Sequence, residues 1–144
     1  VKQHGANLTS SPAAYETIKA HLQDTGLKPS CYDLILTGDL GQLGRDIVLD
    51  LFRRDGVELS NLADCGTMIY DLEGQDVHCG GSGCGCSAVV LNGYLMDGLK
   101  QGRWKRLLFC GTGALLSPTS TQQGESIPAI WHAVALAAPG CERA

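Results

Sequence analysis

The sequence lacks an excess of positive charge. It holds 11 Lys and Arg against 15 Asp and Glu, a formal net charge of −4. Nucleic-acid-binding domains are usually strongly basic, so we expect no nucleic-acid partner. One basic cluster surrounds Trp104, and we interpret it as the solvated end of a helix, where the helix dipole favours cations. Its members are Lys100, Arg103, Lys105 and Arg106.

A membrane-spanning segment is also missing from the pattern, because a span needs about 18 or more apolar residues. The apolar run after Cys86 is interrupted by Asn92, Asp97 and Lys100. No apolar leader of the secretory type opens the sequence. We therefore expect the seven cysteines to be buried thiols rather than disulfides.

Nucleotide-binding motifs are absent or incomplete. There is no G-K-[ST] signature of a phosphate-binding loop. A dinucleotide fingerprint that began at Gly81 would need glycine or alanine where Cys86 stands. We expect no nucleotide and no other cofactor.

The metal-ligand spacing is unfavourable as well. His78, Cys79, Cys84 and Cys86 form H-C-x₄-C-x-C, whereas zinc and iron–sulfur sites usually place their thiolates in C-x₂-C pairs. Within a helix, Cys84 and Cys86 would point about 200° apart and could not share one ion. We expect no metal; a cysteine metal site, perhaps with Cys65, is the alternative hypothesis.

What the sequence does have is a glycine-rich turn followed by an apolar segment. Four glycines lie within residues 80–85, and the apolar segment continues to Leu99. This pattern predicts a helix that begins near Ser82 to Cys84 and ends near Gly102. Apolar residues surround nearly its whole circumference as far as Met96, so we expect Cys86 to Leu99 to be the most buried helix, enclosed between two layers.

The remaining elements alternate between helices and short apolar strands, which indicates one α/β domain. Ser11 is expected to cap the first helix, with Pro12 at its first position. The last two strands show no clean alternation and are expected to be buried on both faces. The expected segments are helices at Ala13–Thr25 and Ile47–Arg54, a turn at Asp64–Gly66, and strands at Tyr32–Thr37, Thr67–Tyr70, Arg106–Gly111 and Ala129–Ala138.

Nucleophilic catalysis is a further hypothesis from the residues. A cysteine at the head of the central helix would have its thiol pKa lowered by the helix N-terminus, and His78 could serve as its base. No third, orienting group can be assigned from the sequence. His132 lies in an apolar segment and is expected to be a hydrogen-bonded core histidine.

Several segments resemble the stage V sporulation protein AD family of endospore-forming bacteria, from about Ala13 to Leu136. They are YDLILTGDLG, DCGTMIYD, GGSGCGCSAVVLNGYL and LLFCGTGALLSPTSTQQGESIPAIWHAVAL. Members of that family are similar to thiolases and ketoacyl synthases, in which two α/β halves stack as α/β/α/β/α layers. The resemblance implies that residues 1–144 are a thiolase-like C-terminal half with a mixed sheet and one buried central helix, the N-terminal half being absent.

The resemblance also implies a function and a location. The family binds dipicolinic acid as part of a spore membrane complex that moves this acid into the developing spore. The implied partners are dipicolinic acid, the other SpoVA membrane proteins, and the chain's own N-terminal half or a second copy. The implied location is peripheral, on the cytoplasmic side of the spore inner membrane.

Acyl-condensing relatives place a histidine where Gly38-Asp39 stands and an asparagine where Ser82 stands. Both differences remove a group that handles protons or stabilises an oxyanion, so the resemblance implies binding rather than catalysis. A thiolase-like acyltransferase is the alternative. Free N–H groups at a helix head suit a carboxylate, and we expect the ligand contacts to be Gly38, Asp39, Gly81, Ser82, Gly83 and Cys84.

Overall fold

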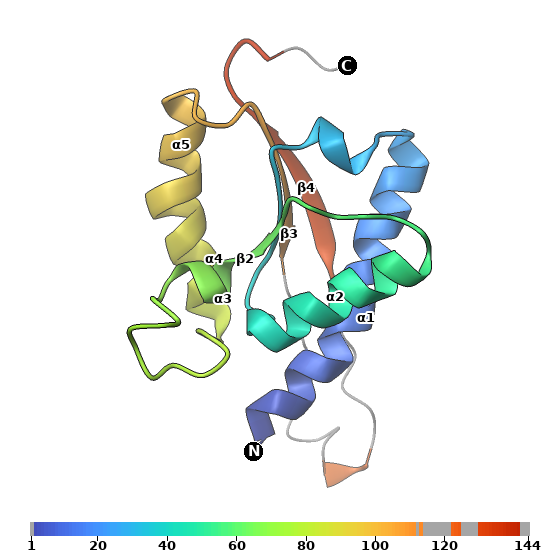
Figure 1. Ribbon diagram of the computed structural model, residues 1–144, viewed down its shortest axis with the longest axis vertical. Helices are drawn as coiled ribbons and strands as arrows, with labels where there is room; N and C mark the ends of the chain where they lie inside the picture. Colours follow the sequence, from blue (N-terminus) through green and yellow to red (C-terminus); the bar gives the residue numbers. More distant parts are fainter. Residues whose placement is uncertain (1, 112, 114–121, 125–129, 142–144) are drawn as a thin grey trace.

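The computed structural model describes residues 2–111, 113, 122–124 and 130–141 (Figure 1). Its centre is a four-stranded sheet in the order β2-β1-β3-β4. Strand β1 (Leu34–Thr37) runs parallel to β2 (Leu62–Asp64) and β3 (Arg106–Gly111), while β4 (His132–Ala137) is antiparallel to β3. The expected α/β class with a mixed sheet is therefore confirmed.

Helices cover both faces of the sheet (Figure 1). Helices α1 (Lys2–Thr25) and α2 (Gly41–Arg54) lie on one face, on the right in the figure. The other face carries one nearly continuous helical segment. This segment, called the central helix below, comprises α4 (Cys84–Val90), the π-helix η2 (Leu91–Leu95) and α5 (Met96–Lys100), and a short helix, α3 (Cys65–Met68), precedes it. A single turn, η1 (Pro29–Cys31), leads into β1.

Alternation along β1 and β3 divides the interior into two cores. Ile35 and Leu108 face α1 and α2, where they join a cluster that includes Ile18 and Phe52. Leu36 and Leu107 face the central helix and pack with residues such as Leu95. Burial on both faces accounts for the continuous apolar runs of these two strands, and it confirms the prediction for Arg106–Gly111.

The start of the first helix was predicted wrongly. Helix α1 begins at Lys2, not after Ser11, and Pro12 lies inside it. The φ angle of proline suits a helix, but an interior proline removes one N–H donor and crowds the carbonyl four residues earlier, so the helix contains it at a cost in stability. The end was predicted correctly, because Gly26 has φ +67° and its N–H donates to the Gln23 carbonyl at 3.3 Å.

The second helix also starts earlier than expected, at Gly41 rather than Ile47. The segment Thr67–Tyr70 is not a strand: helix α3 occupies Cys65–Met68, and the strand is β2, just before it. The physical reason is Asp64, whose side chain accepts a hydrogen bond from the Gly66 N–H and so caps a helix where we expected a turn.

Strand β4 is shorter than predicted and is not buried on both faces. It pairs only with β3 among the described strands, and four of its six residues are exposed. His132 is exposed, so its interpretation as a core histidine was wrong. β4 is an edge strand of the described sheet, and three of its six residues are alanines, which have little side chain to bury. Part of the predicted segment, Ala129, lies outside the described residues.

The central helix begins and ends where the sequence predicted, but it is not enclosed. Leu95 and Leu99 are buried against the sheet, whereas Val89 is 63% exposed and Tyr94 47% exposed. The prediction that this is the most buried helix is therefore wrong for this chain. Its outer apolar face is exposed because no second layer of the described residues covers it.

Candidate functional site: the junction of two loops

Two segments that the sequence singled out meet at the carboxyl end of β1. The Gly83 N–H donates to Oδ2 of Asp39 at 2.9 Å across 44 residues of sequence. Gly38 is buried beneath the surface, Asp39 is half-buried, and Ser82 is exposed. We call Gly38, Asp39 and Gly81 to Cys84 the loop junction; Cys84 begins α4 and Gly83 is its N-cap.

The junction is held in place by Asp64, a residue that the sequence analysis assigned only to a turn. Its fully buried carboxylate accepts hydrogen bonds from the Thr37 hydroxyl at 2.6 Å and from the N–H groups of Leu40, Gly41 and Gly66 at 2.9, 2.9 and 3.0 Å. These donors belong to the end of β1, the head of α2 and the head of α3. Burial raises the pKa of the Asp64 carboxyl, and the four donors oppose that shift.

Two backbone hydrogen bonds hold the glycine-rich loop in place. The Gln42 N–H donates to the Cys79 carbonyl at 2.8 Å, and the Gly81 N–H donates to the Gly66 carbonyl at 2.7 Å. One bond joins the loop to α2 and the other joins it to α3. The loop therefore lies across the carboxyl ends of β1 and β2, where Figure 1 shows it beside the start of α4.

The glycines of the loop serve two different purposes. At Gly81 a Cβ atom would lie 3.0 Å from Cys86 Sγ and from Tyr70 Cε2, and at Gly66 it would lie 2.2 Å from the Gly81 carbonyl oxygen. These two glycines allow close approach. Gly83 instead has φ +129° with open space around it, so there the backbone conformation requires glycine.

The buried thiols near the junction are poor nucleophiles. Burial raises the pKa of Cys65 to about 12, and burial alone does the same for Cys110. A thiol with so high a pKa stays protonated near pH 7, and the thiolate is the reactive form. Cys86 is half-buried with its Sγ near Gly81, and six of the cysteines are free thiols.

The histidines do not complete a catalytic group in the described residues. His78 is exposed, has φ 52°, and lies 3.5 Å from Asp76 rather than within a buried site. His21 is bonded to the Tyr32 hydroxyl at 2.7 Å on the other side of the sheet. Within the described part of the chain, no three His, Cys, Asp or Glu side chains lie close enough together to bind a metal ion.

Chemically, the junction combines N–H donors at a helix head with one carboxylate already bound there. The Asp39 carboxylate takes the place that an external anion would take at the Gly83 N–H. A ligand carboxylate at this position would have to displace Asp39 or bond to neighbouring N–H groups. The sequence analysis named these residues as expected ligand contacts, and it missed that the Asp39 carboxylate accepts a hydrogen bond from the Gly83 N–H as an internal anion.

Comparison with known proteins agrees with the resemblance noted in the sequence. The family described as stage V sporulation protein AD (SpoVAD) matches residues 2–137. The chain belongs to this family. The stage V sporulation protein AD of Bacillus subtilis (strain 168) is 47% identical over 125 residues, which are 86% of this chain and 37% of that relative. The chain thus spans well under half the length of the curated relative that it matches.

Among the helices of the described residues, none combines the length and the apolar character that crossing a bilayer requires. Helix α1 has the length, but its residues are largely polar.

Proposed function

We propose that this chain is a non-catalytic, thiolase-fold binding domain of a sporulation protein, and that it binds dipicolinic acid for uptake into the developing spore. One observation carries the proposal: the Gly83 N–H bond to Asp39 joins the loop after β1 to the head of α4. Ligands of open α/β sheets bind outside the carboxyl ends of parallel strands, where neighbouring connections diverge. Strand β1 lies between β2 and β3, so its carboxyl end is such a place.

The mode of binding follows from the donors at the junction. A ligand carboxylate replaces the Asp39 side chain at the Gly83 N–H and adds bonds to the Ser82 hydroxyl and to N–H groups at the start of the first helical turn. The helix dipole contributes about 0.3–1 kcal/mol to an anion at this place. The negative charge of Asp39 repels the ligand carboxylate, which makes binding readily reversible.

The absence of catalysis is supported by the residues at two positions. Asp39 and Ser82 stand where the resemblance places a proton-handling histidine and an oxyanion-stabilising asparagine in condensing relatives. The Cys65 thiol beside them is held protonated by burial. An acyltransferase would need a nucleophile and a base at this place, and no contact among the described residues favours that alternative.

Assembly is part of the proposal. The outer face of the central helix, with Val89 and Tyr94 exposed, is apolar enough to need a cover. We assign that cover to the N-terminal half of a longer protein or to a second copy. The assembled protein would lie on the cytoplasmic side of the spore inner membrane, peripheral to the other SpoVA membrane proteins.

Isothermal titration calorimetry with dipicolinate tests the proposal on this chain and on a version joined to an N-terminal half. Replacing Asp39→Asn removes the competing charge and keeps an acceptor for the Gly83 N–H, so affinity should rise roughly three- to tenfold, or about 0.6–1.4 kcal/mol. The matched control is Asp46→Asn, an exposed carboxylate that pairs with Arg45 on α2; it should leave affinity unchanged. Absence of binding to either protein, or equal effects of the two substitutions, would contradict the proposal.

A further inference from the structure

Strand β4 forms a long, uncharged edge of the sheet (Figure 1). It pairs with β3 through six consecutive residue pairs, and no described residue pairs with its other side. The opposite edge, β2, has only three residues and ends in Asp64. Natural sheets protect a long edge with charged side chains, proline or a bulge. The sequence of β4, HAVALA, contains neither a Lys, Asp or Glu nor a proline, and its register is unbroken, so this edge can accept another strand.

The backbone groups on this edge belong to three alanines. The Ala138 N–H donates to the Lys105 carbonyl, and the Ile130 N–H donates to the Gly113 carbonyl, each at 2.8 Å. Because hydrogen-bonded pairs alternate with non-bonded pairs in antiparallel strands, the even-numbered residues of β4 bond to β3. The odd-numbered residues therefore point their N–H and C=O groups away from the sheet. These outward residues are Ala133, Ala135 and Ala137.

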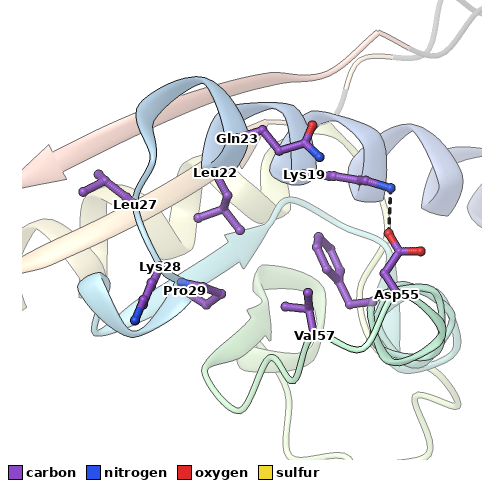
Figure 2. A pocket seen from close by; sticks show the side chains of 9 residues that line it. Lys19, Leu22, Gln23, Leu27, Lys28, Pro29, Asp55 and Val57 are labelled. Carbon is purple, nitrogen blue, oxygen red and sulfur yellow. Dashed lines mark hydrogen bonds and ion pairs between the residues drawn. The ribbon is translucent and has the colours of Figure 1, made fainter.

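The face of β4 towards α1 leaves room for a neighbouring strand. Helix α1 is tied to the end of α2 by an ion pair in which Lys19 Nζ lies 2.6 Å from Oδ2 of Asp55 (Figure 2). Ala133 packs against the core cluster that α1 helps to form, whereas Ala135 and Ala137 are exposed. A second strand can therefore approach the outer half of β4 without displacing α1.

A second copy of β4 fits this edge best in one register. Antiparallel pairing about a two-fold axis can place Ala135 opposite Ala135 of the second copy. The same register places Ala133 opposite Ala137, so that all three outward alanines find partners. A shift by two residues in either direction loses one of these pairs within the strand. On the central-helix face, the exposed Val134 then lies opposite Leu136 of the second copy, and the two form an apolar cross-strand pair.

The charge of the edge also favours a second copy. His132 is the only titratable side chain of β4, and in this register it lies opposite Ala138 of the second copy, so no like charges meet. An acidic or basic strand would find no charge of opposite sign here. We propose that β4 pairs with β4 of a second copy and joins two four-stranded sheets into one. This contact is separate from the exposed face of the central helix and does not depend on dipicolinate binding.

Amide hydrogen exchange measured by NMR tests the contact residue by residue. The starting protein is the double variant Val89→Lys, Tyr94→Lys, in which the exposed face of the central helix no longer favours association. With rising protein concentration, exchange of the three outward alanine amides should slow about tenfold or more, because they become hydrogen-bonded. The even-numbered amides of β4 are already bonded to β3 and should change little. A dimer whose outward amides exchange freely, or a chain that stays monomeric, would overturn the proposal.

Proline at position 135 removes one donor of the contact and keeps the sheet within the chain. The Ala135 N–H points away from β3, and proline is tolerated at such edge positions. Ala135→Pro should weaken the dimer about tenfold, since the central pair loses both of its hydrogen bonds. The matched control is Ala135→Ser, which keeps the N–H and a small side chain and should leave the dissociation constant unchanged. Equal dissociation constants of the two variants in sedimentation velocity would contradict the pairing.

Opposite charges at the same position test the register. Because Ala135 faces itself across the two-fold axis, Ala135→Lys alone and Ala135→Asp alone each bring like charges together. An equimolar mixture of the two variants should associate about three- to fivefold more tightly than either variant by itself, which is the range of a cross-strand charge pair. A mixture that associates no more tightly than its components would show that the two copies do not meet at this residue.

Discussion

At the residue scale, the buried Asp64 carboxylate holds together the segments that form the site. Its carboxylate connects Thr37 with the N–H groups at the heads of α2 and α3. Such a buried acceptor with four donors holds three segments in one relative position. The Asp39–Gly83 bond at the surface depends on this arrangement, because Asp39 lies between Thr37 and Leu40 in the chain.

Replacing Asp64→Asn should therefore destabilise the fold by about 2 kcal/mol or more, since the amide nitrogen would face buried donors and leave them unsatisfied. Asp46→Asn, on the exposed side of α2, should cost less than about 0.5 kcal/mol. Urea unfolding of both variants, followed by circular dichroism, measures the difference. Equal stabilities would show that Asp64 is not the group that holds the junction together.

The sequence shows why Asp64 was missed and Asp39 was not. Asp39 follows an apolar strand that the run Leu34 to Thr37 makes plain. Asp64 is the last residue of a strand of only three residues, and Thr67 to Tyr70 after it is more apolar than the strand itself. An aspartate two residues before a glycine is typical both of a turn and of a helix cap, and only the helix that follows at Cys65–Met68 decides between them.

At the element scale, the glycine-rich loop is held by close backbone contact with α3. The Gly81 N–H bond to the Gly66 carbonyl requires that neither residue carry a side chain between the two segments. The loop is therefore a structural platform for the head of α4. Its glycines were recognised in the sequence, but their partner Gly66 could not be, because contact between distant segments leaves no local pattern.

Substituting Gly66→Ala should cost about 2–3 kcal/mol, because its Cβ would overlap the Gly81 backbone oxygen at 2.2 Å and force the loop to shift. Gly85→Ala is the matched control: it lies in α4 with no atom within 4 Å of its Cβ, so helix propensity should stabilise the protein by up to about 1 kcal/mol. Thermal melting of the two variants should move in opposite directions. A Gly66→Ala protein as stable as the wild type would disprove the close contact.

At the scale of the whole molecule, the exposed face of the central helix is the main departure from the sequence prediction. The apolar pattern from Ala88 to Leu99 correctly indicated a helix, but it predicted cover on two sides, and only the sheet side is covered among the described residues. A pattern of apolar residues records which surface favours burial and not what covers it. Leu95 packs on the sheet, while Val89 and Tyr94 face outward.

This face should make the isolated chain self-associate. Sedimentation velocity should show a concentration-dependent rise in mass, and the double variant Val89→Lys, Tyr94→Lys should shift the chain towards monomer because charges would have to be buried in the contact. Leu43→Lys, which changes an exposed apolar residue on α2 at the opposite face, serves as the control and should not alter association. A wild-type chain that remains monomeric at high concentration would show that the exposed face of the central helix does not drive association.

The most direct test of the central claim is a ¹⁵N NMR titration with dipicolinate, because it reports where the ligand binds as well as whether it binds. The account predicts saturable shifts of the Asp39, Ser82, Gly83 and Gly85 amides, with a tighter midpoint in Asp39→Asn. Saturable shifts confined to residues elsewhere in the chain would place the acid at another site. Those shifts, or none that saturate, would contradict binding at the loop junction.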